Sequence, residues 1–292
     1  MQVKVPLTLF SDIDDSQICK GTVLRRIREQ EIIELFGIQD RRLDDKLNLV
    51  GCTPITHKNP TEDGLFQFGD VVSHELSNHL PVFSSNYIME IDQDDPKDLI
   101  NCLVITLKLR PFTKTGIGVY FDEKRNTNII SPNPYCKLGK YLSLKKDELH
   151  EFQDLLTRVG HITNDPKFIL LIEKYLFSVS GVQISDKNRF LELAIAMEMI
   201  LLPKKSEELR FRFSLRGSKL LNMFNGQDKK EAFDLTKTIY DVRSDLAHKG
   251  ISDKLSRELL LKCQEVTSLL IKKYIEDDSL FNDKKLDEIC LG

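Results

Sequence analysis

The chain has 292 residues, of which 41% are hydrophobic and 30% are charged, and it carries a net charge of −3 at pH 7. This length accommodates about two domains, and the composition is that of an ordinary soluble globular protein. The slightly acidic balance argues against a protein that coats nucleic acid through general electrostatics.

The cysteines and the apolar runs indicate the cellular compartment. The cysteines are scattered without the Cys-x2-Cys spacing of a zinc site, and the first residues are too short in apolar length for a secretion signal. No apolar run approaches the length of a membrane span. We therefore expect a cytoplasmic protein with reduced thiols, no membrane association, no bound metal and no cofactor.

The first part of the chain favours β-structure. Residues 2–10 alternate as a strand does, whereas residues 22–36 show a charged helical pattern in which Arg25 is expected to be solvated. Residues 100–109 and 116–121 are rich in β-branched side chains and predict a β-hairpin. We expect a β-rich or mixed module at residues 1–97 and a second domain at residues 98–292.

Two groups of residues in the first module resemble metal-binding motifs without matching them. His74 and His79 bracket a Glu-Leu-Ser-Asn stretch that resembles a zinc-protease helix but has one residue too many. Two histidines five positions apart cannot share a helix face for zinc ligation. Asp12, Asp14 and Asp15 follow a strand, where acids more often serve as turn and cap residues. We assign no metal site to either group.

Helical patterns dominate the second half, so the chain is predicted to be α+β. Residues 165–179, 189–202 and 208–216 each show an apolar helical pattern, and Pro203 ends the second of these helices. Glu198 lies within the apolar pattern, where an acid is costly unless it is paired. We expect it to orient Arg243 or Arg212 within the bundle or to form a structural ion pair.

A basic stretch lies between residues 204 and 219. Arg212 and Arg216 are four positions apart and share a helix face, opposite Phe211 and Leu215. A local cationic patch on a mildly acidic body fits phosphate recognition at a site. The alternative is a solvated helix face.

Residues 229–249 predict the helix with the most informative side chains. They contain no proline or glycine, and apolar residues recur at the spacing of one helix face: Leu235, Ile239, Val242 and Leu246. Gly250 follows where a helix end favours a residue tolerant of positive φ. Arg243 and His248 lie roughly 140° apart around this helix, on either side of a face that carries Tyr240, Ser244 and Ala247.

Arginine and histidine together can cleave RNA without a metal ion. Arginine is a permanent cation that binds phosphate with a planar set of donors, and histidine exchanges a proton near neutral pH. Tyr240 would stack on a base or donate to a phosphate, and Ser244 would hydrogen-bond a phosphate. The alternative is that Arg243 and His248 are solvated residues or partners of the last helix carbonyls.

The spacing of Arg243 and His248 resembles the Arg-x4-6-His signature of the HEPN superfamily. Three segments occur in the order of the Apea-like HEPN family: an apolar helix carrying acids, Arg-Phe-Ser-Leu-Arg at residues 212–216, and Tyr-x2-Arg-Ser-x3-His at residues 240–248. The resemblance covers roughly residues 98–268. In the branch that accepts AMP, a tyrosine follows the histidine by two positions, and this position is Gly250 here.

The resemblance implies an all-α HEPN helical bundle from about residue 145, with a site formed at a homodimer interface. It implies an endoribonuclease of prokaryotic defence or toxin type that leaves 2′,3′-cyclic phosphates. RNA and a second copy of the chain are the expected partners, with a phage-derived or nucleotide trigger or a cognate antitoxin as further ones. The first module would then sense a trigger, place substrate or restrain the nuclease. The alternative is a non-catalytic module for RNA binding or dimerisation.

Overall fold

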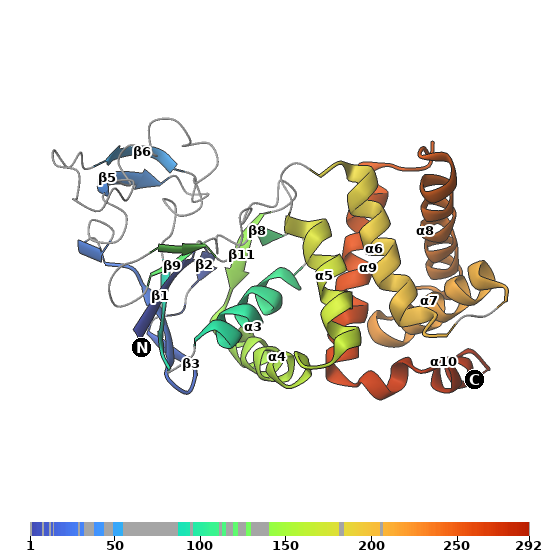
Figure 1. Cartoon of the computed structure of the whole chain (residues 1–292), viewed down its shortest axis with the longest axis horizontal. Helices are drawn as coiled ribbons and strands as arrows, with labels where there is room; N and C mark the ends of the chain where they lie inside the picture. Colours follow the sequence, from blue (N-terminus) through green and yellow to red (C-terminus); the bar gives the residue numbers. More distant parts are fainter. Residues whose placement is uncertain are drawn as a thin grey trace. The chain divides into compact units, whose positions relative to one another are not determined.

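The computed structural model (Figure 1) describes residues 2–7, 9–11, 13, 15–28, 30–31, 38–43, 49–54, 87–93, 96–110, 113–114, 119–121, 127–129, 140–180, 184–204 and 207–291. The chain divides into two compact units. The first comprises Met1–Leu107 and Thr113–Asp154, and the second comprises Lys108–Phe112 and Leu155–Gly292. The first is a mixed unit built on β-sheets and the second is helical, which confirms the predicted α+β class.

The largest sheet of the first unit is antiparallel throughout its described part. Its strand order is β10-β9-β1-β7-β4-β3, formed by Thr127–Ile129, Val119–Phe121, Gln2–Leu7, Tyr87–Asp92, Thr22–Arg26 and Ser16–Cys19. A parallel sheet has the order β2-β11-β8, from Leu9–Ser11, Lys140–Leu144 and Thr113–Lys114. Two further strands, β5 (Ile38–Leu43) and β6 (Leu49–Pro54), pair with each other.

Strand β1 confirms the strand predicted at the N-terminus. Val3, Val5 and Leu7 are buried, and Lys4 between them is partly exposed, which is the period-two pattern of a half-buried strand. The strand pairs with β7 along its whole length, from Gln2 opposite Asp92 to Leu7 opposite Tyr87. The predicted segment continues into β2 at Leu9.

The helix predicted at residues 22–36 is wrong over its first five residues, which form strand β4. Thr22 and Leu24 are buried and the strand pairs with β7. Arg25, predicted to be solvated, is buried and donates to Glu31 at 2.7 Å and to Glu90 at 2.6 Å. The spacing of apolar residues in this segment suggested a helix with its charged residues in water. In the structure the segment pairs as a strand with β7, and Arg25 is buried beside the two carboxylates.

The hairpin predicted from residues 100–109 and 116–121 is wrong in its first half, because residues 100–108 belong to helix α3, Lys97–Lys108, whereas Val119–Phe121 of the second half form strand β9. The amide of Ile100 donates to the Pro96 carbonyl at 2.9 Å, and Asp98 lies in the first turn, where an acid suits the helix dipole. Most side chains of the helix are buried, so its apolar residues are not confined to one stripe. A short, evenly apolar run with β-branched residues does not distinguish a buried helix from a strand.

The division into units differs from the boundary predicted after residue 97. Residues 98–107 and 113–154 belong to the first unit. The reason is strand pairing: β9 lies against β1, and β11 lies against β2, so segments beyond residue 98 complete sheets that begin at the N-terminus.

The second unit contains the helices predicted for the second half. After α4 (Leu149–Ile162) come α5 to α8, and their bounds are Pro166–Ser180, Asp186–Leu201, Leu209–Asn225 and Lys229–Lys249. Then α9 (Arg257–Glu276) is followed by a short 3-10 helix, Asp278–Phe281, and by α10 (Asp283–Leu291). Helix α6 packs against α5, α8 and α9, and α7 packs against α8 (Figure 1).

A close approach holds α7 against α8. A Cβ atom at Gly217 would lie 2.8 Å from Cγ2 of Thr236, so only glycine fits here without a shift. The Thr236 hydroxyl is buried and lies 3.0 Å from the Ser214 carbonyl and 2.8 Å from the Ala232 carbonyl. This contact sets the spacing of the two helices that carry most of the predicted site residues.

Candidate functional site

Helix α8 is fixed at both ends by its own sequence. The Asp228 side chain accepts from the amides of Lys230 at 2.9 Å and Glu231 at 3.0 Å, which caps the first turn. Gly250 has φ of 72° and closes the last turn, as the sequence predicted. Ile239, Val242 and Leu246 are buried, so the predicted apolar face is confirmed at these positions.

Arg243 reaches from α8 to Glu198 on α6. The guanidinium donates to the Glu198 carboxylate at 2.8 Å, and the two side chains are 27% and 20% exposed. Burial raises the pKa of Glu198, and Arg243 partly opposes this shift. The Nε atom of Arg243 is buried and has no hydrogen-bond partner among the described residues. The sequence predicted that Glu198 would pair with an arginine, and the structure selects Arg243.

Tyr240 lies beside this ion pair. Its ring packs on Phe213 with centroids 5.4 Å apart. The pKa of the phenol is raised, first by burial and then by the negative charge of Glu198. The hydroxyl therefore stays protonated over the physiological range and remains a hydrogen-bond donor.

His248 is exposed in the last turn of α8. Among the described contacts, none joins His248 to Arg243, so one copy of the chain does not bring the two side chains into direct contact. Ser244 is half-buried and Ala247 is exposed between them. Asp245 pairs with Lys249 at 2.8 Å and accepts from the Ser252 hydroxyl, so it faces these partners and not Arg243 or His248.

The basic patch predicted around Arg212 and Arg216 is not open. The side chain of Arg216 is 1% exposed, and its guanidinium donates to Asp283 at 2.9 Å, to Asp287 at 2.7 Å and to the Leu201 carbonyl at 2.7 Å. Arg212 also donates to Asp287, at 3.0 Å. These contacts correct the expectation that the two arginines receive phosphate: helix α10 supplies the acids that neutralise them.

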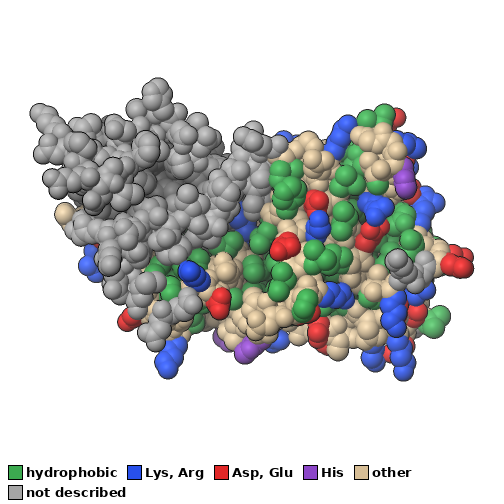
Figure 2. All heavy atoms as spheres, viewed as in Figure 1, with side chains coloured by type: hydrophobic (Ala, Val, Ile, Leu, Met, Phe, Trp, Pro, Cys, Tyr) green, Lys and Arg blue, Asp and Glu red, His purple; other side chains and the backbone are tan. Residues whose placement is uncertain are grey.

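Arg210 is engaged in a similar way. It forms a two-bonded ion pair with Asp241 of α8, through Nε at 2.5 Å and Nη2 at 2.7 Å. On the face of the helical unit in Figure 2, basic and acidic side chains are interspersed. This distribution agrees with the absence of a strong net charge in the sequence.

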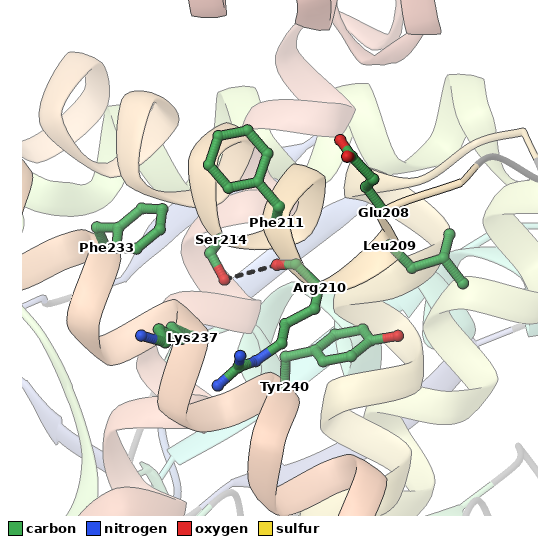
Figure 3. A pocket seen from close by; sticks show the side chains of 8 residues that line it. All are labelled: Glu208, Leu209, Arg210, Phe211, Ser214, Phe233, Lys237 and Tyr240. Atoms are coloured by element: carbon green, nitrogen blue, oxygen red, sulfur yellow. Dashed lines mark hydrogen bonds between the residues drawn. The ribbon is translucent and has the colours of Figure 1, made fainter.

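An open groove between α7 and α8 was not predicted. It has a volume of about 830 Å³, and its lining includes three aromatic side chains, Phe211, Phe233 and Tyr240. Figure 3 shows these rings together with Lys237 and Arg210. The sequence carried one signal for it: Phe233, Lys237 and Tyr240 recur at helical spacing on a face of α8 other than the apolar one.

The two groups that resemble metal-binding motifs lie largely outside the described residues, since His74, His79, Asp12 and Asp14 are not among them. Within the described ranges, no three His, Cys, Asp or Glu side chains are grouped so that they could hold a metal ion. The described part of the chain also has no helix whose length and apolar character would let it cross a membrane. Cys19, Cys102, Cys263 and Cys290 are free thiols.

Comparison with protein-family models, curated proteins and solved structures found no match to this chain. The HEPN assignment therefore stays a prediction that rests on the order and spacing of the motifs.

Proposed function

We propose that this chain is a metal-independent endoribonuclease of HEPN type, acting in prokaryotic defence or as a toxin. The observation that carries the proposal is the Glu198–Arg243 pair, which holds a partly exposed guanidinium on the same helix as an exposed histidine. Arg243 is thus oriented by one carboxylate and keeps donors for a second anion. A guanidinium binds a phosphate through such donors.

In the proposed reaction, His248 takes the proton from a ribose 2′-hydroxyl. The 2′-oxygen then bonds to the adjacent phosphorus as the bond to the 5′-oxygen breaks. Arg243 stabilises the charge that develops on the phosphoryl oxygens, and stabilisation of this kind typically accounts for a large share of an enzyme's rate enhancement. The 5′-oxygen leaves with a proton from His248 of the partner subunit or from water. The products are a 2′,3′-cyclic phosphate and a 5′-hydroxyl.

The proposed reaction requires Arg243 and His248 to act at one phosphate, and a homodimer could bring them together more readily than a single chain. Arg243 and His248 lie on opposite sides of a helix face and make no direct contact in one copy. A second α8 facing the first would bring a histidine of one copy toward the arginine of the other. In the proposed regulation, a phage-derived or nucleotide trigger, or a cognate antitoxin, controls the nuclease in the cell.

The second candidate is a non-catalytic module for RNA binding or dimerisation. The same Glu198–Arg243 pair favours it, because an arginine already bound to a carboxylate is also a typical structural ion pair. In that case Arg243 and His248 hold an assembly together and perform no chemistry.

The test is cleavage of labelled tRNA and messenger RNA in excess EDTA. Wild type is compared with His248→Ala and Arg243→Ala, and with the matched controls His161→Ala and Arg257→Ala, which change exposed residues of the same types on α4 and α9. Native mass is measured for all five. We expect cutting by wild type and both controls only, with cyclic-phosphate ends.

Other outcomes separate the two candidates. Loss of the dimer in His248→Ala or Arg243→Ala, with no cleavage by any protein, supports the interaction module. Cleavage that survives both substitutions places the activity elsewhere and contradicts the assigned roles.

A further inference from the structure

The groove between α7 and α8 contains large apolar side chains that the fold leaves in water. Phe211 is 54% exposed and Leu209 is 39% exposed, although both belong to a helix that packs on the core. The Phe211 ring meets Phe233 edge-on, with centroids 6.4 Å apart and planes at 63°. The outer face of Phe211 is therefore available to a flat ligand, and exposed aromatic surface of this kind marks binding sites.

The charges of the groove are distributed unevenly. Arg210 is neutralised by its ion pair with Asp241. Lys237 forms no short ion pair among the described residues, but it lies near enough to the same carboxylate to help lower the pKa of Asp241. Glu208 also lines the groove, and Figure 3 shows its carboxylate on the far side from the Lys237 amine. One end of the groove thus presents aromatic rings beside a positive charge.

The face of α8 that lines the groove extends beyond it toward the proposed catalytic histidine. Phe233, Lys237, Tyr240, Ser244 and His248 follow one another at intervals of three or four residues, so they share one face of the helix. Tyr240 and His248 are separated by roughly 12 Å along the helix axis. A short single strand lying on this face would reach from the rings to His248.

We infer that this groove binds single-stranded RNA, with an unpaired base stacked on Phe211 and a neighbouring phosphate at Lys237. This inference rests on the proposed function and names the substrate class of the same site: unpaired RNA. A nucleotide offers a flat π-face that can stack on the rings and a phosphate anion that can bind the lysine. A ligand that matches this lining needs both features. The volume of about 830 Å³ lies within the range of small-ligand pockets.

A second copy of the chain would also cover Phe211 and Leu209. It would explain the exposed apolar surface, but it would leave the Lys237 amine beside the Phe211–Phe233 pair without a function. The charge of the groove therefore favours RNA. Self-association enters as an outcome of the test.

The experiment measures binding separately from cleavage. Binding of a labelled single-stranded oligonucleotide with 2′-O-methyl riboses, which cannot be cut by the proposed route, is followed by fluorescence anisotropy. The variants are Phe211→Ala, Phe211→Trp and Lys237→Ala, with Phe177→Ala as the matched control, since Phe177 is 52% exposed on α5. We expect about tenfold weaker binding for Phe211→Ala, retention for Phe211→Trp, and wild-type binding for the control. Lys237→Ala should bind less tightly and with a weaker dependence on salt.

Equal binding by wild type and Phe211→Ala, or no binding by wild type, overturns the inference. A change of native mass in Phe211→Ala makes the groove a self-association surface and also overturns it. Cleavage of unmodified RNA is measured in parallel. Suppose that His248→Ala abolishes cleavage while the Phe211→Ala variant cleaves RNA with an unchanged KM. Then RNA binding in the groove is refuted and the ribonuclease proposal is supported. If Phe211→Ala weakens RNA binding while wild type cleaves no RNA, binding in the groove is supported and the ribonuclease proposal is refuted.

Discussion

The Glu198 carboxylate accepts a 2.8 Å hydrogen bond from the Arg243 guanidinium and so joins α6 to α8. The two residues are separated by 45 positions in the chain. The contact fixes the direction in which Arg243 leaves its helix. It makes Glu198 a positioning residue in the proposed reaction, since it would act on phosphate only through the arginine.

Substitution of Glu198 tests this role. If the ribonuclease proposal holds, Glu198→Ala should lower kcat about tenfold to a hundredfold, because a small misplacement of a catalytic group has effects of this size. Glu198→Gln keeps an acceptor for Arg243 and should restore most of the loss. The measurement is kcat and KM on one RNA substrate. Equal kcat for wild type and Glu198→Ala would rule out a positioning role.

The Arg25–Glu31 pair of the first unit predicts a dependence of stability on pH. Its hydrogen bonds lower the pKa of Glu31 from 4.5 to about 2, and Arg25 is the largest cause. A carboxyl with a depressed folded-state pKa stabilises the fold above its unfolded pKa, and this contribution is lost as pH falls from about 4.5 toward 2. Glu31→Gln should therefore lower the free energy of unfolding by about 1–3 kcal/mol at pH 7 and by roughly half as much at pH 3, which still lies above the folded-state pKa.

Urea unfolding at both pH values measures this difference, with exposed Glu151→Gln as the control. A Glu31→Gln effect of the same size at pH 7 and pH 3 would show that the charge of the pair contributes nothing.

Gly217 and Gly160 predict opposite effects of the same substitution. Both lie in helices, where alanine is favoured over glycine by about 1 kcal/mol. Nothing lies within 4 Å of a Cβ at Gly160, whereas a Cβ at Gly217 would lie 2.8 Å from Cγ2 of Thr236. Gly160→Ala should stabilise the protein, and Gly217→Ala should destabilise it by about 1–3 kcal/mol.

Thermal unfolding of both variants measures these effects. Adding Thr236→Ser to Gly217→Ala removes the clashing methyl group and keeps the hydroxyl, so it should recover part of the loss. Gly217→Ala with a stability at or above that of wild type would mean that α7 and α8 separate at little cost.

The acids of α10 should matter because Arg216 is buried. Removing both Asp283 and Asp287 leaves a guanidinium with 1% exposure and only the Leu201 carbonyl as acceptor among the described contacts. An uncompensated buried charge typically costs about 3–5 kcal/mol. Asp283→Ala with Asp287→Ala should therefore cause a large loss in urea unfolding.

The exposed pair of Lys285 and Glu288 is the control, since its two side chains are 53% and 48% exposed. Replacing both by alanine should change the free energy of unfolding by less than about 1 kcal/mol. Equal losses for the two double variants would refute the structural role of Arg216.

The sequence by itself determined the helices of the second half and the placement of Arg243 and His248 on one of them. These features depend on neighbours a few residues apart: apolar spacing, Pro203 after α6, and Gly250 after α8. The Asp245–Lys249 pair could be anticipated for the same reason. Strand β1 followed from simple alternation of buried and exposed side chains.

Only the tertiary structure decided which charged side chains are neutralised by ion pairs and which could bind an anion. Arg212 and Arg216 looked like a phosphate patch because the acids that neutralise them lie on α10, more than 60 positions further along the chain. The identity of the partner of Glu198 and the groove beside Phe211 depend in the same way on how α6, α7 and α8 pack. Helix α3 was mistaken for a strand because its burial comes from distant segments. Local sequence reports local periodicity, whereas burial and ion pairing are set by residues that only folding brings together.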